Sequence, residues 1–395
     1  MLSRVERASH GLVDERREAE HGPPEPPSPI VPDYGGACLS EVVPTLVHRH
    51  QLSEKGELPA WLPEPAASAE QIVLLVVDGL GFAQLQEHEQ HAPTLCSMLG
   101  GAITTVAPTT TATALTSLVT GTAPKDHGVL GYRVRSDWGV LNVLRWSTDG
   151  EDARQRIPPR TFQRVEPFCG IDPPVVSRAE FASTGFTTCH LAGARLVGWR
   201  VPSSIRVEVA ALVRAGEPFV YAYYDGVDKV AHDTGLGEHY VAELSATDRI
   251  VSDLLSDLPE GCALVVTADH GQVAMHGDPI VLAPEIAKDV ELLSGEGRFR
   301  WLHVREGAEE AVVEACRDRY GDVAWVLRRE EIFEAGWFGG RPAPELAARL
   351  GDVALVAFAP VAFFDPADTG ELRLLARHGS LTAAEVLVPL VAWAP

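Results

Sequence analysis

Three apolar runs in the chain have the length of buried strands. They are Gln71–Val77, Phe219–Tyr224 and Leu264–Thr267. Short apolar runs that end at turn residues are typical of strands in the core of a sheet. Two further stretches, Val140–Trp146 and Phe186–Leu191, are also predicted as strands.

The clearest helix lies between the second and third of these strands, over Glu238–Leu258. Its apolar residues recur at 3.6-residue spacing, at Val241, Leu244, Val251, Leu255 and Leu258. A shorter amphipathic stretch covers Ser40–Leu52, and the Thr-rich segment Pro108–Thr120 is predicted as a loop that enters a helix. Because helix and strand alternate in this way, we expect an α/β sandwich with a mostly parallel central sheet.

The pattern changes over residues 279–364, where a small α+β insertion is predicted. Strands are expected at Arg298–Val304, Val323–Leu327 and Val353–Phe358, and helices at Ala308–Arg319 and Pro344–Leu350. The N-terminal residues 1–36 are charged and then proline-rich, so we expect a disordered or loosely attached tail before the main domain, residues 37–395.

Composition and charge narrow the class of protein. The chain has 395 residues, with 33 basic against 55 acidic ones, a formal charge of −22. This balance argues against binding to a nucleic-acid polymer, which usually needs a basic surface. No stretch approaches the ~20 apolar residues of a membrane span, and the N-terminus lacks the apolar core of a signal peptide. We therefore expect a cytoplasmic protein that acts on a small molecule, with its six cysteines as free thiols; the oligomeric state is left open.

Acidic and imidazole residues follow the apolar runs at four places. They are Asp78, then Asp225, Asp228 and His232, then Asp269 and His270, and late in the chain His378. In open α/β sheets, ligands bind at the carboxyl ends of the strands. Carboxylates and imidazoles gathered there are what a cluster of divalent metal ions needs. The sequence therefore predicts a metal-dependent enzyme.

Plainer interpretations exist for several of these residues. Asp78 precedes a glycine, and such pairs commonly form turns after strands. Asp228 and His232 are four residues apart and would share a helical face, but Asp225 and Asp233 compete with Asp228 for the same role.

The chain also supplies nucleophile candidates in Thr109, Thr110, Thr111 and Thr113. A threonine at the start of a helix can be activated by metal coordination of its oxygen. The helix N-terminus also offers backbone N–H groups to a phosphate. The simpler interpretation is a Thr-rich helix cap without chemistry.

Taken together, these motifs resemble those of the type I phosphodiesterase/nucleotide pyrophosphatase family, which belongs to the alkaline phosphatase superfamily. The motifs are Val77-Asp78-Gly79, Pro108-Thr109-x-Thr111, Thr120-Gly121, Pro124-x-x-His127-Gly128, Asp228-x-x-x-His232, Ala268-Asp269-His270-Gly271 and His378-Gly379. They follow the family's order, so the likeness covers nearly all of the chain beyond the tail.

The resemblance implies an alkaline phosphatase-like three-layer sandwich and a site for two divalent metal ions, Zn²⁺ or, as the alternative, Mn²⁺. The implied ligands of one ion are Asp78, Asp269, His270 and the Thr111 oxygen, and those of the other are Asp228, His232 and His378. The family places its nucleophile three residues after the proline of its motif, which selects Thr111 over Thr110. Two metal ions ~3.5–4 Å apart can stabilise both the attacking and the departing oxygen of an in-line displacement.

The expected reaction is hydrolysis of a phosphate diester or pyrophosphate bond through a phospho-threonine on Thr111. The chain departs from the family at two points. Relatives usually have Phe-Pro-Asn after the nucleophile, where this chain has Ala112-Thr113-Ala114. Nucleotide-cleaving relatives also place an asparagine where this chain has Tyr132, whose phenol is expected to bind the substrate by donating to an oxyanion. Arg133, next to it, would favour a dianionic monoester. A phosphomonoesterase, a phosphonate hydrolase, a phosphomutase and a catalytically silent metal-binding protein therefore remain alternatives.

Overall fold

The computed structural model describes residues 26–395, so most of the predicted tail lies outside the described residues. Within this range the largest sheet has seven strands in the order β2-β17-β10-β1-β9-β7-β8. Their bounds are β1 (Gln71–Val77), β2 (Leu99–Thr104), β7 (Pro174–Arg178), β8 (Arg195–Trp199), β9 (Phe219–Tyr224), β10 (Cys262–Thr267) and β17 (Leu387–Trp393). Strands β10, β1, β9, β7 and β8 pair in parallel, and β17 is antiparallel to both of its neighbours. The predicted α/β fold with a mostly parallel central sheet is confirmed.

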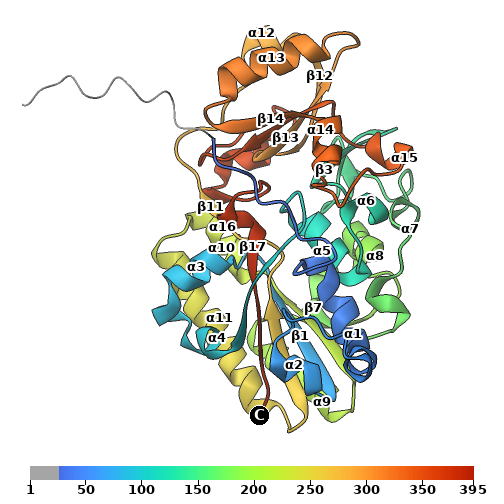
Figure 1. Ribbon diagram of the computed structural model, residues 1–395, viewed down its shortest axis with the longest axis vertical. Coiled ribbons are helices and arrows are strands. Elements are labelled where there is room, and N and C mark those ends of the chain that lie inside the picture. The colour runs from blue at the N-terminus through green and yellow to red at the C-terminus, as the bar shows by residue number, and fades with distance from the viewer. Residues whose placement is uncertain (1–25) are drawn as a thin grey trace, which may run out of the picture.

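Helices cover this sheet on both sides. Figure 1 shows α1 to the right of the strands and α11 to their left. The first group packs around α1 and comprises α1 (Leu39–Lys55), α2 (Glu64–Ser68), α5 (Thr111–Thr120), α8 (Gly185–His190) and the 3-10 helix η2 (Pro167–Gly170). The second packs around α11 and comprises α4 (Pro93–Ser97), α9 (Ser203–Arg214), α10 (Gly226–Thr234), α11 (Glu238–Asp257) and η1 (Glu89–His91). The remaining short helices near this sheet are α3 (Phe82–Glu87), α6 (Pro124–His127), α7 (Pro159–Phe162), α16 (Ala383–Val386), η3 (Ala179–Ser183) and η4 (Thr369–Arg373).

The central strands are buried along nearly their whole length, as their apolar sequences predict. All residues of β9 and β10 are buried, and so are all but the first of β1. The register pairs Val77 with Tyr224 and Val76 with Thr267. The segments that follow these strands therefore start at the same edge of the sheet.

One predicted strand is wrong. Phe186–Leu191 lies almost entirely in helix α8, which begins at Gly185. Thr184 caps this helix, because its Oγ1 accepts a hydrogen bond from the backbone N–H of Thr187 at 3.1 Å. Phe186, Cys189 and His190 are buried, a spacing of three and four residues that belongs to one face of a helix. The other predicted strand, Val140–Trp146, is shorter than expected and corresponds to β4 (Gly139–Asn142).

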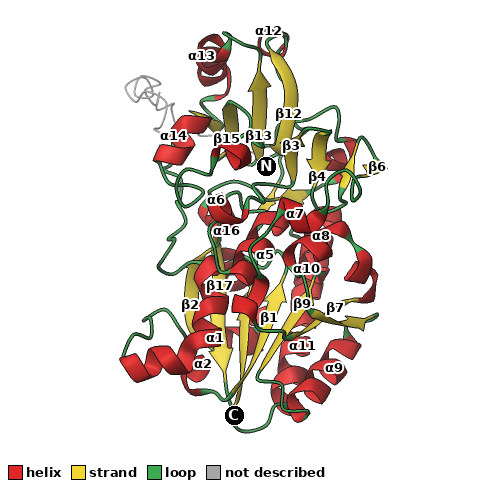
Figure 2. Cartoon of the chain, turned by 90° about the vertical axis from the view of Figure 1, so that its right-hand side faces the viewer, coloured by secondary structure: helices red, strands yellow, loops and turns green. Residues whose placement is uncertain are grey.

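Two four-stranded sheets lie beyond the carboxyl edge of the central sheet, above it in Figure 2. The first is the antiparallel sheet β12-β13-β15-β14, formed by β12 (Val290–Glu296), β13 (Phe299–Val304), β14 (Ala324–Arg328) and β15 (Val353–Ala357). Helices α12 (Pro284–Ala287), α13 (Glu309–Tyr320), α14 (Arg329–Glu334) and α15 (Pro344–Ala347) accompany it. All of these elements fall within residues 279–364, and the extent of that segment as a separate insertion stays a prediction.

The second sheet is a meander of β3 (Arg133–Ser136), β4, β5 (Ser147–Thr148) and β6 (Glu151–Asp152). It packs beside the first, since β3 contacts β12. A short ladder of β11 (Val273–Ala274) with β16 (Ala376–Arg377) brings the segment before His378 against the segment after His270.

A buried ion pair connects the β12–β15 sheet to the segment that carries α16. Arg298 donates to both carboxylate oxygens of Glu385, at 2.7 and 2.8 Å, and neither side chain is exposed to solvent. The same guanidinium donates to the carbonyls of Ala357, Ala359 and Val361. This arrangement fixes one end of the β12–β15 sheet next to the loop that holds His378.

The six cysteines are free, as expected. No helix within residues 26–395 is both long and apolar enough to cross a lipid bilayer.

Candidate metal centre and active site

The first predicted ligand group comes together after strands β1 and β10 and at the start of α5. The Nε2 atom of His270 lies 3.5 Å from Asp78 Oδ1 and 3.4 Å from Asp269 Oδ2. The Oγ1 atom of Thr111, the first residue of α5, lies 3.1 Å from the same nitrogen. Asp78, Asp269 and His270 are buried, and their ligand atoms all lie within 4.8 Å of one another.

The second predicted group lies beside the first. Asp228 Oδ1 is 3.2 Å from His232 Nε2, across one turn of α10, and 3.9 Å from His378 Nε2. The rings of His378 and His270 stack with their centres 3.5 Å apart. The ligand atoms of Asp228, His270 and His378 also lie within 4.8 Å of one another, so His270 sits between the two groups. The structure thus brings all seven predicted ligand residues together.

All three imidazoles are oriented in the same way. The Nδ1 atom of His270 lies 3.0 Å from the Gly271 carbonyl, that of His232 2.7 Å from the Ala376 carbonyl, and that of His378 2.7 Å from the Thr109 carbonyl. A carbonyl can only accept, so Nδ1 carries a proton in each ring, and Nε2 is the atom that the neutral ring would offer to a metal ion. Lone pairs that face carboxylates repel them unless a cation lies between, so this is the orientation of metal-binding histidines.

The carboxylates also fit a cation. Asp78 Oδ2 accepts a hydrogen bond from Tyr223, and Asp269 Oδ1 accepts from the backbone of Gly79 and of His270 at 3.0 and 3.1 Å. The other oxygen of each, Asp78 Oδ1 and Asp269 Oδ2, is buried without a hydrogen-bond partner. Burial, and then the charges of Asp269 and Asp228, raise the pKa of Asp78 well above its ordinary value. Buried carboxylates in such contact need positive charge between them, which divalent ions supply.

The predicted motifs place glycines where a side chain would not fit. Gly79 has φ +74°, and a Cβ there would lie 2.9 Å from the Cβ of Asp228 and from Gln272 Nε2. Gly379 has φ +128°, and its Cβ would lie 2.8 Å from the carboxylate carbon of Glu296. Gly79 therefore lets the backbone approach Asp228 closely, and Gly379 lets it approach Glu296.

Among the candidate nucleophiles, Thr111 has its hydroxyl beside the candidate metal ligands. The Thr109 hydroxyl donates to the Ser380 carbonyl and accepts from the Gly379 N–H, both at 2.9 Å, which holds the His378 loop in place. Thr113 is fully buried in α5. Thr110 is the N-cap residue of α5, but its side chain makes no capping hydrogen bond. The interpretation of this stretch as a simple Thr cap is therefore not supported.

Two aspartates that competed with Asp228 are placed elsewhere. Asp225 is paired with Arg178, whose Nε lies 2.7 Å from Oδ1, and with Lys229 at 2.5 Å. Asp233 is exposed to solvent. Asp228 instead accepts a hydrogen bond from Gln272 Nε2 at 2.6 Å and faces the histidines.

Two cavities meet at Thr111. One, of about 260 Å³, has polar and charged side chains in its walls, among them Tyr132, Arg145, Glu296 and Arg377. The other, of about 240 Å³, is mainly apolar and lies against the aromatic rings of Phe181, Phe186, Tyr221 and Tyr223. Thr111, Leu144 and Asp228 line both cavities. We call them the polar chamber and the apolar chamber.

Tyr132, at the family's asparagine position, and the next residue, Arg133, have different placements. Tyr132 lines the polar chamber, where its hydroxyl accepts a hydrogen bond from Asn142 Nδ2 at 2.6 Å. Arg133 does not reach the polar chamber, because its guanidinium is buried in ion pairs with Asp365 and, at 3.7 Å, with Asp368. The expected contribution of Arg133 to substrate charge is therefore not supported by its position.

Sequence reasoning missed several residues at this site. Tyr223 and Gln272 hold ligand carboxylates, and Arg145 and Glu296 line the polar chamber. Tyr223 and Gln272 lie close to the motifs in sequence, so their position next to a strand end was a usable signal. Arg145 and Glu296 come from the meander and from β12, and nothing in their local sequence points to the site.

His127 of the Pro-x-x-His-Gly motif connects two helices. Its Nδ1 accepts from the Val129 N–H at 3.1 Å, and its Nε2 lies 2.7 Å from Ser117 Oγ on α5. Burial lowers the pKa of His127 to about 3, so the ring is neutral. It attaches α6 to the helix that begins with Thr111.

Solved structures with this fold include known enzymes. Mouse ectonucleotide pyrophosphatase/phosphodiesterase 5 has a TM-score of 0.62 and 17% identity, over 82% of this chain and 88% of that one. The human protein of the same name has a TM-score of 0.63 and 17% identity, over 82% and 88%. Phosphonoacetate hydrolase from Sinorhizobium meliloti 1021, in complex with phosphonoformate, has a TM-score of 0.61 and 18% identity, over 82% and 90%. At these identities the likeness shows the fold alone.

The family of this chain follows from sequence comparison. No curated protein sequence matches the chain. The family model described as type I phosphodiesterase/nucleotide pyrophosphatase matches residues 72–204 and 210–381. These ranges contain Thr111 and all the predicted metal ligands, and members of this family are metal-dependent phosphoric ester hydrolases. The chain therefore belongs to the type I phosphodiesterase/nucleotide pyrophosphatase family.

Proposed function

We propose that this enzyme hydrolyses a phosphate diester or pyrophosphate bond, with Thr111 as the nucleophile and a phospho-threonine as the intermediate. The observation that carries the proposal is the position of Thr111 Oγ1, 3.1 Å from His270 Nε2 and at the junction of the two chambers. A hydroxyl at that point can reach a phosphorus atom held between the chambers.

Two divalent ions fit the ligand groups, with Asp78, Asp269, His270 and Thr111 around one and Asp228, His232 and His378 around the other. When bound, they would lower the pKa of the Thr111 hydroxyl and neutralise charge on the phosphoryl oxygens. The mixed nitrogen and oxygen donors suit Zn²⁺, and Mn²⁺ is the alternative.

In the proposed reaction, Thr111 Oγ1 forms a bond to phosphorus as the bond to the departing alcohol or phosphate breaks. Water then attacks the phospho-threonine, which releases phosphate or a monoester and restores the hydroxyl. The N-terminus of α5 offers the phosphoryl oxygens backbone N–H groups and the positive end of the helix dipole. Tyr132, in the polar chamber, is proposed to donate its phenol hydrogen to one of these oxygens.

The two chambers favour a diester over a monoester. A diester carries a substituent on each side of phosphorus, and the chambers offer a polar and an apolar place for them. A monoester carries only one such substituent, so it would leave one of the two chambers unfilled. The phosphomonoesterase alternative is therefore less well supported.

Phosphonate hydrolysis is the second candidate function. A solved structure with this fold is that of a phosphonoacetate hydrolase, and Arg145 in the polar chamber could bind the carboxylate of such a substrate. Turnover of phosphonoacetate, measured beside bis-p-nitrophenyl phosphate and p-nitrophenyl phosphate, separates these possibilities. We expect the diester to be the best of the three substrates. A small phosphate ester as partner and a cytoplasmic location remain predictions.

The test of the mechanism is to trap the intermediate. Acid quenching during turnover of bis-p-nitrophenyl phosphate should leave a phosphoryl or nitrophenyl-phosphoryl group on the peptide that contains Thr111. Thr111→Ala should lose the label and at least roughly a thousandfold in kcat, while Thr110→Ala serves as the matched control and keeps most activity. Full activity of Thr111→Ala would refute the proposal.

A further inference from the structure

A large cavity is separate from the chambers at Thr111. It has a volume of about 1020 Å³ and lies between the β3–β4 turn, the segment 156–162, the start of α14 and the segment 341–352. None of the residues that line it lines the polar or the apolar chamber. Its size is at the upper end of the roughly 300–1,000 Å³ usual for ligand pockets.

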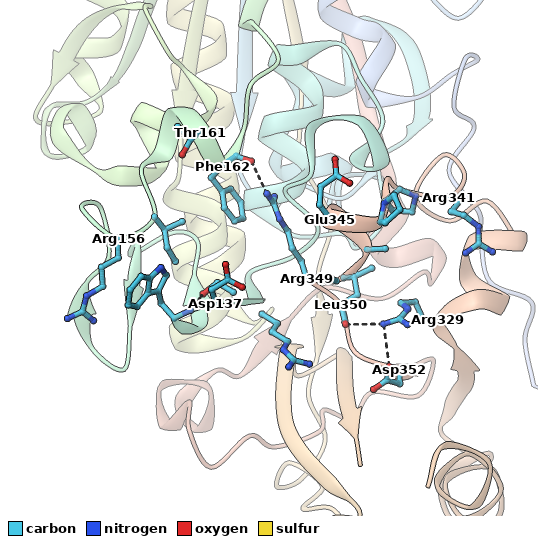
Figure 3. A pocket seen from close by; sticks show the side chains of 18 of the residues that line it. Asp137, Arg156, Thr161, Phe162, Arg329, Arg341, Glu345, Arg349, Leu350 and Asp352 are labelled. Atoms are coloured by element: carbon cyan, nitrogen blue, oxygen red, sulfur yellow. Dashed lines mark hydrogen bonds and ion pairs between the residues drawn. The ribbon is translucent and has the colours of Figure 1, made fainter. Parts of the chain in front are cut away.

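Five arginines and four carboxylates line this cavity, in a chain that as a whole has 55 acidic residues against 33 basic ones. Figure 3 shows Arg156 on one side, Arg329 and Arg341 on the other, and Arg349 beside Phe162 between them. Arg135 is the fifth arginine of the lining. The carboxylates of the lining are Asp137, Glu330, Glu345 and Asp352.

Three of these arginines are part of the cavity wall. Arg329 lies 3.4 Å from Asp352 and 3.7 Å from Glu330, and Arg341 also pairs with Glu330. The guanidinium of Arg349 lies 3.7 Å from the centre of the Phe162 ring and donates to the carbonyls of Phe162 and Gly128. These contacts connect the segment 341–352 to α14, Phe162 and Gly128.

The other two arginines are available to a ligand. Arg135 and Arg156 are exposed, and neither has a carboxylate within 4.0 Å in the part of the chain that the structure describes. Arg156 lies 5.8 Å from the centre of the Trp138 ring, and 54% of Trp138 is exposed.

We propose that this cavity binds a small phosphorylated molecule that carries an aromatic ring. Arg135 and Arg156 bind the phosphate, since guanidinium groups match phosphate oxygens in charge and geometry. The exposed face of Trp138 stacks on the ring of the ligand, a contact that tryptophan makes at low entropic cost. The proposal does not rest on the function proposed above, because the cavity and the metal centre share no residue.

The test is calorimetric titration with AMP as the probe, in a Thr111→Ala background that prevents turnover. The Arg135→Gln/Arg156→Gln double variant should lose one AMP site or bind it roughly tenfold or more weakly, the loss expected when hydrogen bonds to charged groups are removed. Trp138→Ala should weaken AMP binding but leave the binding of inorganic phosphate unchanged. In the wild-type background, the same double variant should hydrolyse bis-p-nitrophenyl phosphate at the normal rate.

Arg200→Gln/Arg319→Gln is the matched control, because it removes the same charge. Both residues are exposed and lie outside the cavity, and neither has an ion-pair partner in the described part of the chain. An AMP site that survives Arg135→Gln/Arg156→Gln, or that weakens equally in the control, would overturn the proposal. If AMP does not bind at the metal centre, the AMP binding that remains should be the part that depends on Arg135 and Arg156. The two proposals can therefore fail independently of each other. If Trp138→Ala binds AMP normally, the aromatic part of the proposal is wrong.

Discussion

At the scale of single residues, the proposed metal centre depends on side chains that hold its candidate ligands. Tyr223 donates its hydroxyl hydrogen to Asp78 Oδ2, which leaves Oδ1 directed at His270. Groups that orient a metal ligand in this way commonly affect metal affinity by roughly 10–100-fold. Two residues earlier in β9, the Tyr221 hydroxyl is buried without a hydrogen-bond partner. The two tyrosines therefore form a natural pair for comparison.

We expect Tyr223→Phe to weaken divalent-metal binding by roughly tenfold or more, with the protein still folded. Tyr221→Phe should leave the affinity nearly unchanged, because no hydrogen bond is lost. Metal titration after chelation measures both variants. Equal affinities of Tyr223→Phe and wild type would show that this phenol does not orient Asp78.

Arg145 offers a second prediction at this scale. It is exposed and lines both the polar chamber and a neighbouring cavity of about 630 Å³. A second charged phosphate on a pyrophosphate substrate would extend in this direction. Arg145→Ala should lower kcat/KM for such a substrate by roughly tenfold and leave bis-p-nitrophenyl phosphate unaffected. The surface variant Arg164→Ala is the control, and an equal loss on both substrates would contradict the assignment.

At the scale of elements, the sequence predicted the central strands and the long helix because their apolar residues are buried on predictable faces. It failed at Phe186–Leu191, where six residues are too few to separate helical from strand spacing and the cap at Thr184 decided the outcome. It also missed β12 (Val290–Glu296), whose polar and glycine residues give no strand signal although pairing with β13 fixes it.

The attachment of the β12–β15 sheet gives a prediction about stability. Arg298→Met leaves Glu385 buried without its partner, and removal of one member of a buried pair typically costs about 3–5 kcal/mol in the free energy of unfolding. Arg298→Met combined with Glu385→Leu should cost less than the sum of the two single changes. Urea unfolding of the four proteins measures the coupling. Additive costs would mean that the pair does not connect the two parts.

His127 makes the stability of the α5–α6 region depend on pH. Its pKa is about 3 in the folded protein against an ordinary 6.5, so the unfolded chain binds a proton more readily. The stabilisation from neutral His127 is therefore full above pH 6.5 and is lost as pH falls toward 3. Between pH 7 and pH 5 this residue should account for roughly 2 kcal/mol of lost stability.

The measurement is urea unfolding of wild type and His127→Gln at both pH values. His127→Gln should lose less stability on acidification, by about that amount, while exposed His50→Gln behaves as wild type. An unchanged pH dependence in His127→Gln would contradict the burial of a neutral ring.

At the scale of the whole molecule, the convergence of the candidate metal ligands could be predicted because parallel strands end at one edge. Asp78 and Asp269 follow neighbouring strands in register, and this topology alone brings them together. The walls of the polar chamber could not be predicted, because Arg145 and Glu296 come from the meander and the β12–β15 sheet. Packing between separate sheets depends on long-range contacts that no local pattern encodes.

The most direct test of the account is the number of divalent ions bound per chain. Elemental analysis of the protein, after dialysis against buffer without metal, should find two Zn²⁺ or Mn²⁺ ions per chain in the wild type. Asp78→Asn and His378→Ala should each reduce the content toward one, and Asp233→Asn, an exposed aspartate, should leave it at two. A wild-type content below two ions, or the same content in Asp78→Asn and His378→Ala as in the wild type, would contradict the two-metal centre.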